Sequence, residues 1–192
     1  MSLRQHGRYD YSPIIERPVY DWPNGTRLAV YLALNLEHFA FGEGLGAQLA
    51  PGGEEPDVLN YAWRDYGNRV GVWRLLRLFD DQPTWFRTDT TPILSIPYPQ
   101  EINDIPAIVV RRVEAAVFAD MIVDNFDEML EQSTEQPLVC GIALHPYIAG
   151  QPFRLRQLRR ALTHIVAHGQ KVWFTHPGAI AEYVINTQTT KS

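Results

Sequence analysis

Two apolar segments of this sequence each end in side chains that can carry acid–base chemistry. Residues 28–36 are almost entirely apolar and are followed directly by Glu37 and His38. Residues 138–144 are also apolar and are followed directly by His145. Hydrolysis of an amide needs one group that takes a proton from water and another that protonates the departing nitrogen. Glu37 as general base and His145 as general acid would supply one candidate for each role.

Both segments have the length and composition of strands that are covered on both faces, as in the parallel sheet of an α/β protein. In such sheets the loops that leave the carboxyl ends of the strands surround a shared crevice, where chemistry takes place. We therefore expect Glu37 and His145 to occupy the same kind of position. The structural alternatives are a Glu37 that faces solvent or caps the next turn, and a His145 that is hydrogen-bonded at the end of its strand.

The remaining elements follow from the spacing of the apolar residues. Helical spacing predicts helices over 61–81, 114–130 and 153–167, and Pro177 opens a short last helix. Asp65 is placed to cap the first of them. Further strands are predicted at 93–96 and 171–175, and the glycine-rich loop 39–60 is predicted to be a lid.

Four strands in alternation with four helices predict a parallel sheet in an α/β fold. A full eight-unit β/α barrel takes roughly 250 residues, so a chain of 192 residues with four strands has barely half of the strands that closure needs. We expect residues 1–27 to form an extended N-terminal arm and residues 28–192 to form a single domain.

Composition excludes several classes of function. The balance of 17 Lys and Arg against 22 Asp and Glu gives a net charge of -5, which predicts no nucleic-acid partner and no membrane partner. No apolar run approaches 18 residues, and residues 1–10 lack the apolar core of a signal peptide, so we expect a cytoplasmic protein. The single cysteine, Cys140, is predicted to be a buried strand thiol.

A histidine pair and a cluster of arginines lie on the predicted helix 153–167 or just after it. Each could carry chemistry, but surface positions explain both more simply. His164 and His168 have the spacing that can place two imidazoles on one metal, yet they fall opposite the apolar stripe and are expected on a solvated face. A basic patch on the same predicted helix is expected to form a solvated face or a subunit contact. It consists of Arg154, Arg156, Arg159 and Arg160.

Three stretches of the sequence resemble the motifs of a known family. They are residues 34–38 (LNLEH), 66–74 (YGNRVGVWR) and 141–152 (GIALHPYIAGQP). These stretches are similar to the polysaccharide deacetylase superfamily (NodB-like, carbohydrate esterase family 4), and most similar to its allantoinase-like branch. They occur in the family's order, and the resemblance spans nearly the whole chain.

The resemblance implies hydrolysis of non-peptide carbon–nitrogen bonds in an N-acetyl sugar, a small amide or a ureide. Glu37 matches the family's catalytic base, and His145 matches the histidine that acts as general acid. His38 stands at a metal-ligand position where the family has an acid. The substrate-contact candidates are Tyr98, Glu101 and Asn103, from a family loop near the active site, together with Tyr147.

The family's His-x-x-x-His metal motif and a further arginine-containing motif are absent between the first predicted helix and the late strands. The resemblance therefore implies that a block of several βα units is missing near residues 80–82, and the expected fold is an incomplete, distorted β/α barrel that lacks central units. The resemblance implies a divalent metal such as zinc, with His38 as a ligand, or a metal-independent hydrolase because the motif is missing.

Two other functions remain open. The chain could be an inactive, truncated relative that binds a ligand or assembles with copies of itself, since an open half-barrel leaves sheet edges unpaired and favours a homo-oligomer. It could also be a sugar-binding module, for which Trp63, Trp85 and Tyr147 are the aromatic candidates.

Overall fold

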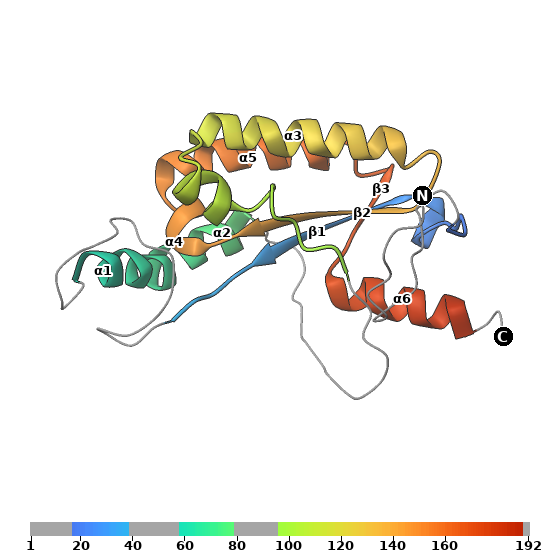
Figure 1. Ribbon diagram of the computed structural model, residues 1–192, viewed down its shortest axis with the longest axis horizontal. Coiled ribbons are helices and arrows are strands. Elements are labelled where there is room, and N and C mark those ends of the chain that lie inside the picture. Colours follow the sequence, from blue (N-terminus) through green and yellow to red (C-terminus); the bar gives the residue numbers. More distant parts are fainter. Residues whose placement is uncertain (1–16, 39–57, 79–95, 190–192) are drawn as a thin grey trace, which may run out of the picture.

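The protein has a small parallel sheet at its centre. The computed structural model describes residues 17–38, 58–78 and 96–189. Its strands are β1 (Leu28–Leu34), β2 (Leu138–Leu144) and β3 (Val172–Phe174), in the order β2-β1-β3 (Figure 1). β1 pairs with β2 over its whole length and with β3 over its first three residues. The expected α/β class with a parallel sheet is confirmed.

Helices cover both faces of this sheet. α3 (Ala115–Gln132) and α5 (Pro152–Val166) lie together on one face, and α6 (Pro177–Thr189) lies on the other (Figure 1). Successive residues of β1 point to opposite faces, as a pleated strand requires. Leu28 and Val30 join the core under α3 and α5, while Ala29 and Tyr31 pack in a second cluster with Trp22 and Ile180.

Several predicted elements are confirmed. β2 spans the predicted strand, α3 and α5 match the predicted helices to within one or two residues, and α6 begins at Pro177. Cys140 is buried in β2, and burial raises the pKa of its thiol to about 11. Within the described residues no helix has the length and apolar character needed to cross a membrane.

The predicted helix 61–81 differs most from expectation. It consists of α1 (Val58–Tyr66), a π-helix η3 (Gly67–Gly71) and α2 (Val72–Leu78). The prediction that Asp65 caps this helix is wrong, because it lies inside α1 and pairs with Arg69. The wider π turn changes the helical register between α1 and α2, and Trp73 at the start of α2 is 61% exposed.

Close backbone packing explains where the π turn occurs. η3 rests on the short helix α4 (Pro146–Ala149), which directly follows His145. A Cβ atom added to Gly67 would lie 2.4 Å from the Cβ of Tyr147, and one added to Gly71 would lie 2.1 Å from the carbonyl oxygen of Pro146. Only glycine allows the two helices to approach this closely.

The segment 96–104 runs beside the carboxyl end of β2. The Ala143 N–H donates to the Ile102 carbonyl oxygen at 3.0 Å, and Asn103 forms an isolated parallel bridge with Ala143. A second π-helix, η4 (Ile105–Val110), follows and was not predicted. This course brings the end of the segment next to His145.

Some expectations fall outside the described residues. These are most of the lid 39–60, residues 93–95 of a predicted strand, Trp85, the position of the missing block near 80–82 and residues 1–16 of the arm.

Candidate active site

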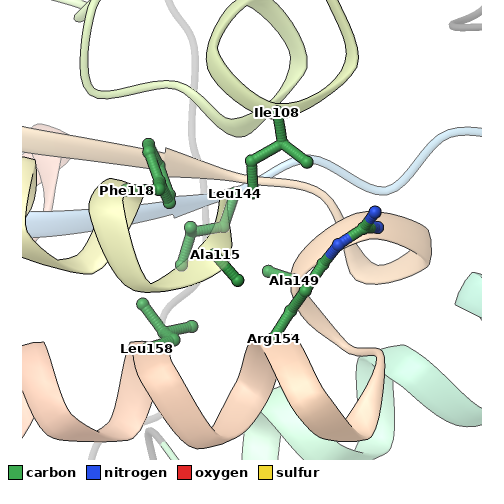
Figure 2. A pocket seen from close by; sticks show the side chains of 7 residues that line it. All are labelled: Ile108, Ala115, Phe118, Leu144, Ala149, Arg154 and Leu158. Carbon is green, nitrogen blue, oxygen red and sulfur yellow. The ribbon is translucent and has the colours of Figure 1, made fainter. Parts of the chain in front are cut away.

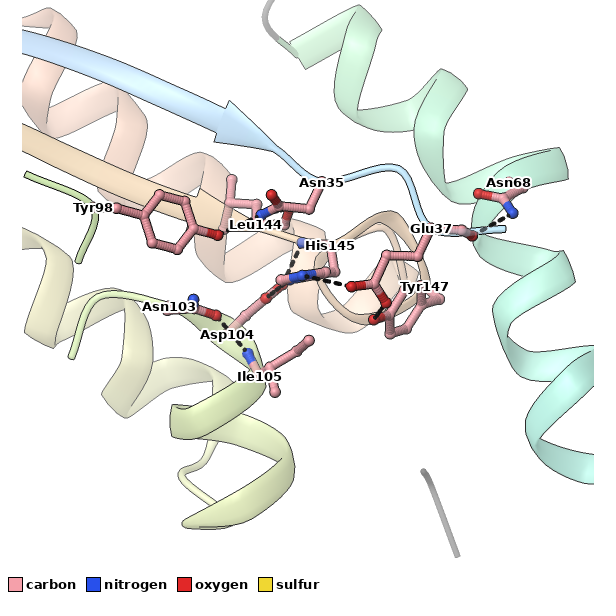
Figure 3. A network of polar contacts seen from close by, with 10 residues as sticks. All are labelled: Asn35, Glu37, Asn68, Tyr98, Asn103, Asp104, Ile105, Leu144, His145 and Tyr147. Atoms are coloured by element: carbon pink, nitrogen blue, oxygen red, sulfur yellow. Dashed lines mark hydrogen bonds and ion pairs between the residues drawn. The ribbon is translucent and has the colours of Figure 1, made fainter. Parts of the chain in front are cut away.

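The structure brings Glu37 and His145 together. β1 and β2 are parallel with Leu34 opposite Leu144, so the chain leaves both strands at the same edge of the sheet. The Asn35 N–H donates to the Leu144 carbonyl oxygen at 2.8 Å and carries the pairing one residue further. His145 Nε2 then lies 3.7 Å from Glu37 Oε1 (Figure 3).

A buried carboxylate holds His145 from the other side. His145 Nδ1 lies 2.6 Å from Asp104 Oδ1, and the His145 backbone N–H donates to Asp104 Oδ2 at 2.9 Å (Figure 3). Asp104 is 0% exposed. With Asp104 as acceptor the Nδ1 atom carries a proton, which leaves Nε2 facing Glu37. Full burial raises the pKa of the Asp104 carboxyl, and the hydrogen bonds and charge of His145 oppose that rise.

Two further residues support Asp104. The Asn103 side-chain oxygen accepts the Ile105 N–H at 3.1 Å, which fixes the backbone on either side of Asp104. Arg154 extends from α5 across a small apolar pocket lined by Leu144 among others, and its guanidinium donates to the Ile148 carbonyl oxygen at 3.5 Å (Figure 2). The charge of Arg154 lowers the pKa of Asp104, although burial has the larger, opposite effect.

The prediction of a solvated basic patch is therefore wrong for Arg154, which is half-buried. The other three arginines of the patch are exposed, as expected. Burial lowers the pKa of the Arg154 guanidinium, and the negative charge of Asp104 opposes this effect.

Glu37 is held at both its side chain and its backbone. The Tyr147 hydroxyl donates to Glu37 Oε2, and the Asn68 side-chain amide donates to the Glu37 carbonyl oxygen at 2.8 Å (Figure 3). Burial raises the pKa of the Tyr147 hydroxyl, and the neighbouring Glu37 raises it further. The Glu37 side chain remains 28% exposed, so water can reach it.

The other predicted site residues lie at different distances from this centre. Tyr98 sits at its rim, where its exposed hydroxyl accepts a hydrogen bond from the Asn35 side chain at 2.9 Å. Asn103 is buried beside Asp104, as described above. Glu101 is not brought to the site, because its exposed carboxylate pairs with Arg111. Tyr147 lies under Glu37 and is 0% exposed.

The described residues do not fit a zinc site. His38 is exposed, and no group of three or more His, Cys, Asp or Glu side chains in this part of the chain is arranged to hold a metal ion. His164 pairs with Asp127 of α3 at 2.7 Å, and His168 Nδ1 contacts the His164 carbonyl oxygen at 3.0 Å. The solvated face expected for these two histidines is therefore only partly observed, because both imidazoles are half-buried and contact Phe126 of α3.

Sequence reasoning missed Asp104 and Asn68. Asp104 directly follows Asn103, one of the substrate-contact candidates, and a catalytic histidine commonly has a carboxylate that orients it. A carboxylate partner for His145 was therefore to be expected, but no local pattern singles out Asp104 among the 22 acidic residues. Asn68 lies within one of the motif stretches, but nothing in its local pattern indicates a contact with Glu37.

No protein-family model matches the sequence, and no curated protein sequence matches it significantly. The structure is similar to the crystal structure of Puue allantoinase, with a TM-score of 0.72 and 20% sequence identity over 91% of this chain and 97% of that chain. It is equally similar to a probable polysaccharide deacetylase from Pseudomonas aeruginosa PAO1, with a TM-score of 0.72 and 20% identity over 86% of this chain and 93% of that one. The protein therefore has the fold of the polysaccharide deacetylase superfamily, which its three motifs predict.

Proposed function

We propose that this protein hydrolyses a non-peptide carbon–nitrogen bond in a small amide, a ureide or an N-acetyl sugar. The observation that carries the proposal is the arrangement of Glu37, His145 and Asp104. A water-accessible carboxylate lies 3.7 Å from an imidazole nitrogen, and a fully buried carboxylate holds the other nitrogen of that imidazole. The similarity to an allantoinase and to a probable polysaccharide deacetylase supports the same class of reaction.

The proposed mechanism uses Glu37 first. Its carboxylate takes a proton from a water molecule as the water oxygen bonds to the substrate carbonyl carbon. Protonated His145 then gives its Nε2 proton to the departing nitrogen as the carbon–nitrogen bond breaks, while Asp104 stabilises the imidazolium and fixes its orientation. No step is assigned to a metal, because the described residues do not form a set that fits one.

The proposed architecture is the incomplete, distorted β/α barrel that the resemblance implies. It is supported by the three parallel strands and by the placement of the site at their carboxyl edge. In this arrangement the edge of the sheet remains accessible to a small substrate beside Tyr98, which is exposed at the rim.

The test is a hydrolysis assay on ureides, including allantoin, followed by N-acetyl sugars and simple amides, with release of the amine or acid product measured. We expect Glu37→Gln and His145→Gln to abolish turnover without loss of the fold. Glu101→Gln and His164→Gln are matched controls, since they make the same chemical changes at ion pairs outside the site. Undiminished turnover by Glu37→Gln would contradict the proposal.

A further inference from the structure

Tyr147 lies directly beneath the proposed general base. It is the second residue of α4, its side chain is 0% exposed, and its hydroxyl donates to Glu37 Oε2 (Figure 3). Its ring packs edge-on against Trp63 with centroids 4.8 Å apart and lies 5.6 Å from the His145 ring. A side chain enclosed in this way acts through its neighbours, because no part of it reaches the surface.

The position of Tyr147 is fixed by close packing of backbone. Gly67 of η3 lies against Tyr147, where any Cβ atom would overlap it. The next residue, Asn68, donates its side-chain amide to the Glu37 carbonyl oxygen at 2.8 Å. Glu37 is therefore held by two elements, η3 at its backbone and α4 at its carboxylate, and these elements also contact each other.

The chemistry of the hydroxyl suits a fixed donor. Burial and the adjacent Glu37 carboxylate both raise the pKa of Tyr147, so the hydroxyl stays protonated at neutral pH and donates to the carboxylate. Because that donation engages Oε2, the other oxygen, Oε1, is the one that faces His145 Nε2.

We propose that Tyr147 is a positioning residue for the general base: its hydroxyl holds Glu37 Oε2, which leaves Oε1 oriented to take the proton of the attacking water. The inference rests on the proposed role of Glu37 and adds to it the group that orients its carboxylate. It assigns Tyr147 an indirect role rather than a direct contact with substrate.

Loss of the hydroxyl has two consequences. The Glu37 carboxylate is free to rotate away from His145, which slows the chemical step without removing any contact to substrate, so kcat falls while KM stays nearly the same. A donated hydrogen bond also favours the ionised form of a carboxylate. Without it, the acidic limb of the pH–rate profile moves toward higher pH.

The test compares Tyr147→Phe with Tyr183→Phe. The control removes one hydroxyl that donates to the Asp21 carbonyl oxygen at 2.5 Å, in the cluster on the α6 side of the sheet. For Tyr147→Phe we expect kcat to fall about ten- to hundredfold, as for a lost hydrogen bond to a charged group, with the shifted acidic limb. We expect neither change in the control. p-Aminophenylalanine at position 147, which keeps the ring and a donor, should restore most of kcat.

The outcomes separate this inference from the proposed function. If Glu37→Gln is inactive but Tyr147→Phe keeps the wild-type kcat and pH profile, the function stands and the positioning role is wrong. A higher KM with unchanged kcat would show a substrate contact and also overturn it. An active Glu37→Gln variant overturns the function and the inference together.

Two measurements keep the test decisive. A crystal structure of Tyr147→Phe with the Glu37 carboxylate in its original place would refute the inference without reference to activity. If circular dichroism shows that Tyr147→Phe does not fold, the test depends on the p-aminophenylalanine variant. That variant keeps a hydrogen-bond donor, so a folded p-aminophenylalanine protein with low kcat would contradict the proposal.

Discussion

Replacement of Asp104 by asparagine should make the protein more stable and less active at neutral pH. Asp104 is fully buried, and burial raises the pKa of its carboxyl despite two hydrogen bonds from His145. Folding at neutral pH therefore has to desolvate a negative charge, which costs free energy. Asparagine has nearly the same shape and carries no charge, so the Asp104→Asn variant avoids that cost.

The sign of the pH dependence follows from linkage. A carboxyl whose pKa is higher in the folded state than in the unfolded chain binds its proton more tightly when folded. Below the unfolded value, about 3.9 for aspartate, both states are protonated and Asp104 has no desolvation cost. The cost appears as pH rises through the unfolded value to the folded one. The stability advantage of Asp104→Asn should therefore be small in acid and grow toward neutral pH.

The loss of activity can be estimated from the two contacts to His145. The asparagine oxygen can still accept the His145 backbone N–H, which lies 2.9 Å from Asp104, but its amide group then faces Nδ1. One hydrogen bond between charged groups is lost, worth about 1.5–3 kcal/mol, or about ten- to hundredfold in kcat. The amide N–H that faces Nδ1 also disfavours a proton on that nitrogen, so the imidazolium that donates from Nε2 is less stable, which adds to the loss.

The assays are urea denaturation between pH 4 and pH 8 and steady-state kinetics on whichever substrate the hydrolysis assay identifies. Asp127→Asn is the matched control, since Asp127 pairs with His164 at a similar distance of 2.7 Å but in a partly exposed position. A variant that is less stable than wild type throughout this range, or one that keeps the wild-type kcat, would refute this account of Asp104.

Three other predictions concern packing, charge and assembly. Gly67→Ala should lower the free energy of unfolding by about 1–3 kcal/mol, the usual cost of overpacking, because its Cβ overlaps Tyr147; an unchanged urea midpoint would contradict this. Arg154→Met should reduce kcat several-fold more at acidic than at neutral pH, since it removes the charge that lowers the pKa of Asp104, and a pH–rate profile parallel to that of wild type would speak against it. The expected homo-oligomer should give a light-scattering mass that is a multiple of 22.0 kDa, and the mass of one chain would rule it out.

Several elements of this fold are specified by local patterns in the sequence. The apolar run of β2, the helical spacing of α3 and α5, and the proline that opens α6 are visible within short windows of sequence, and each element forms where expected. Glu37 and His145 could be placed in the same way, because a parallel sheet brings the carboxyl ends of its strands to one edge whatever the rest of the chain does.

Tertiary structure decided how that edge becomes a site. Asp104 accepts a hydrogen bond from His145, which lies 41 residues away in the sequence, and Tyr147 donates one to Glu37, which lies 110 residues away. Neither contact has a local signal. The π turn at Gly67–Gly71 also arises from packing, since η3 must approach the backbone of α4. Secondary structure depends on neighbours in sequence, whereas these hydrogen bonds depend on which backbones are close enough in space for one side chain to reach another.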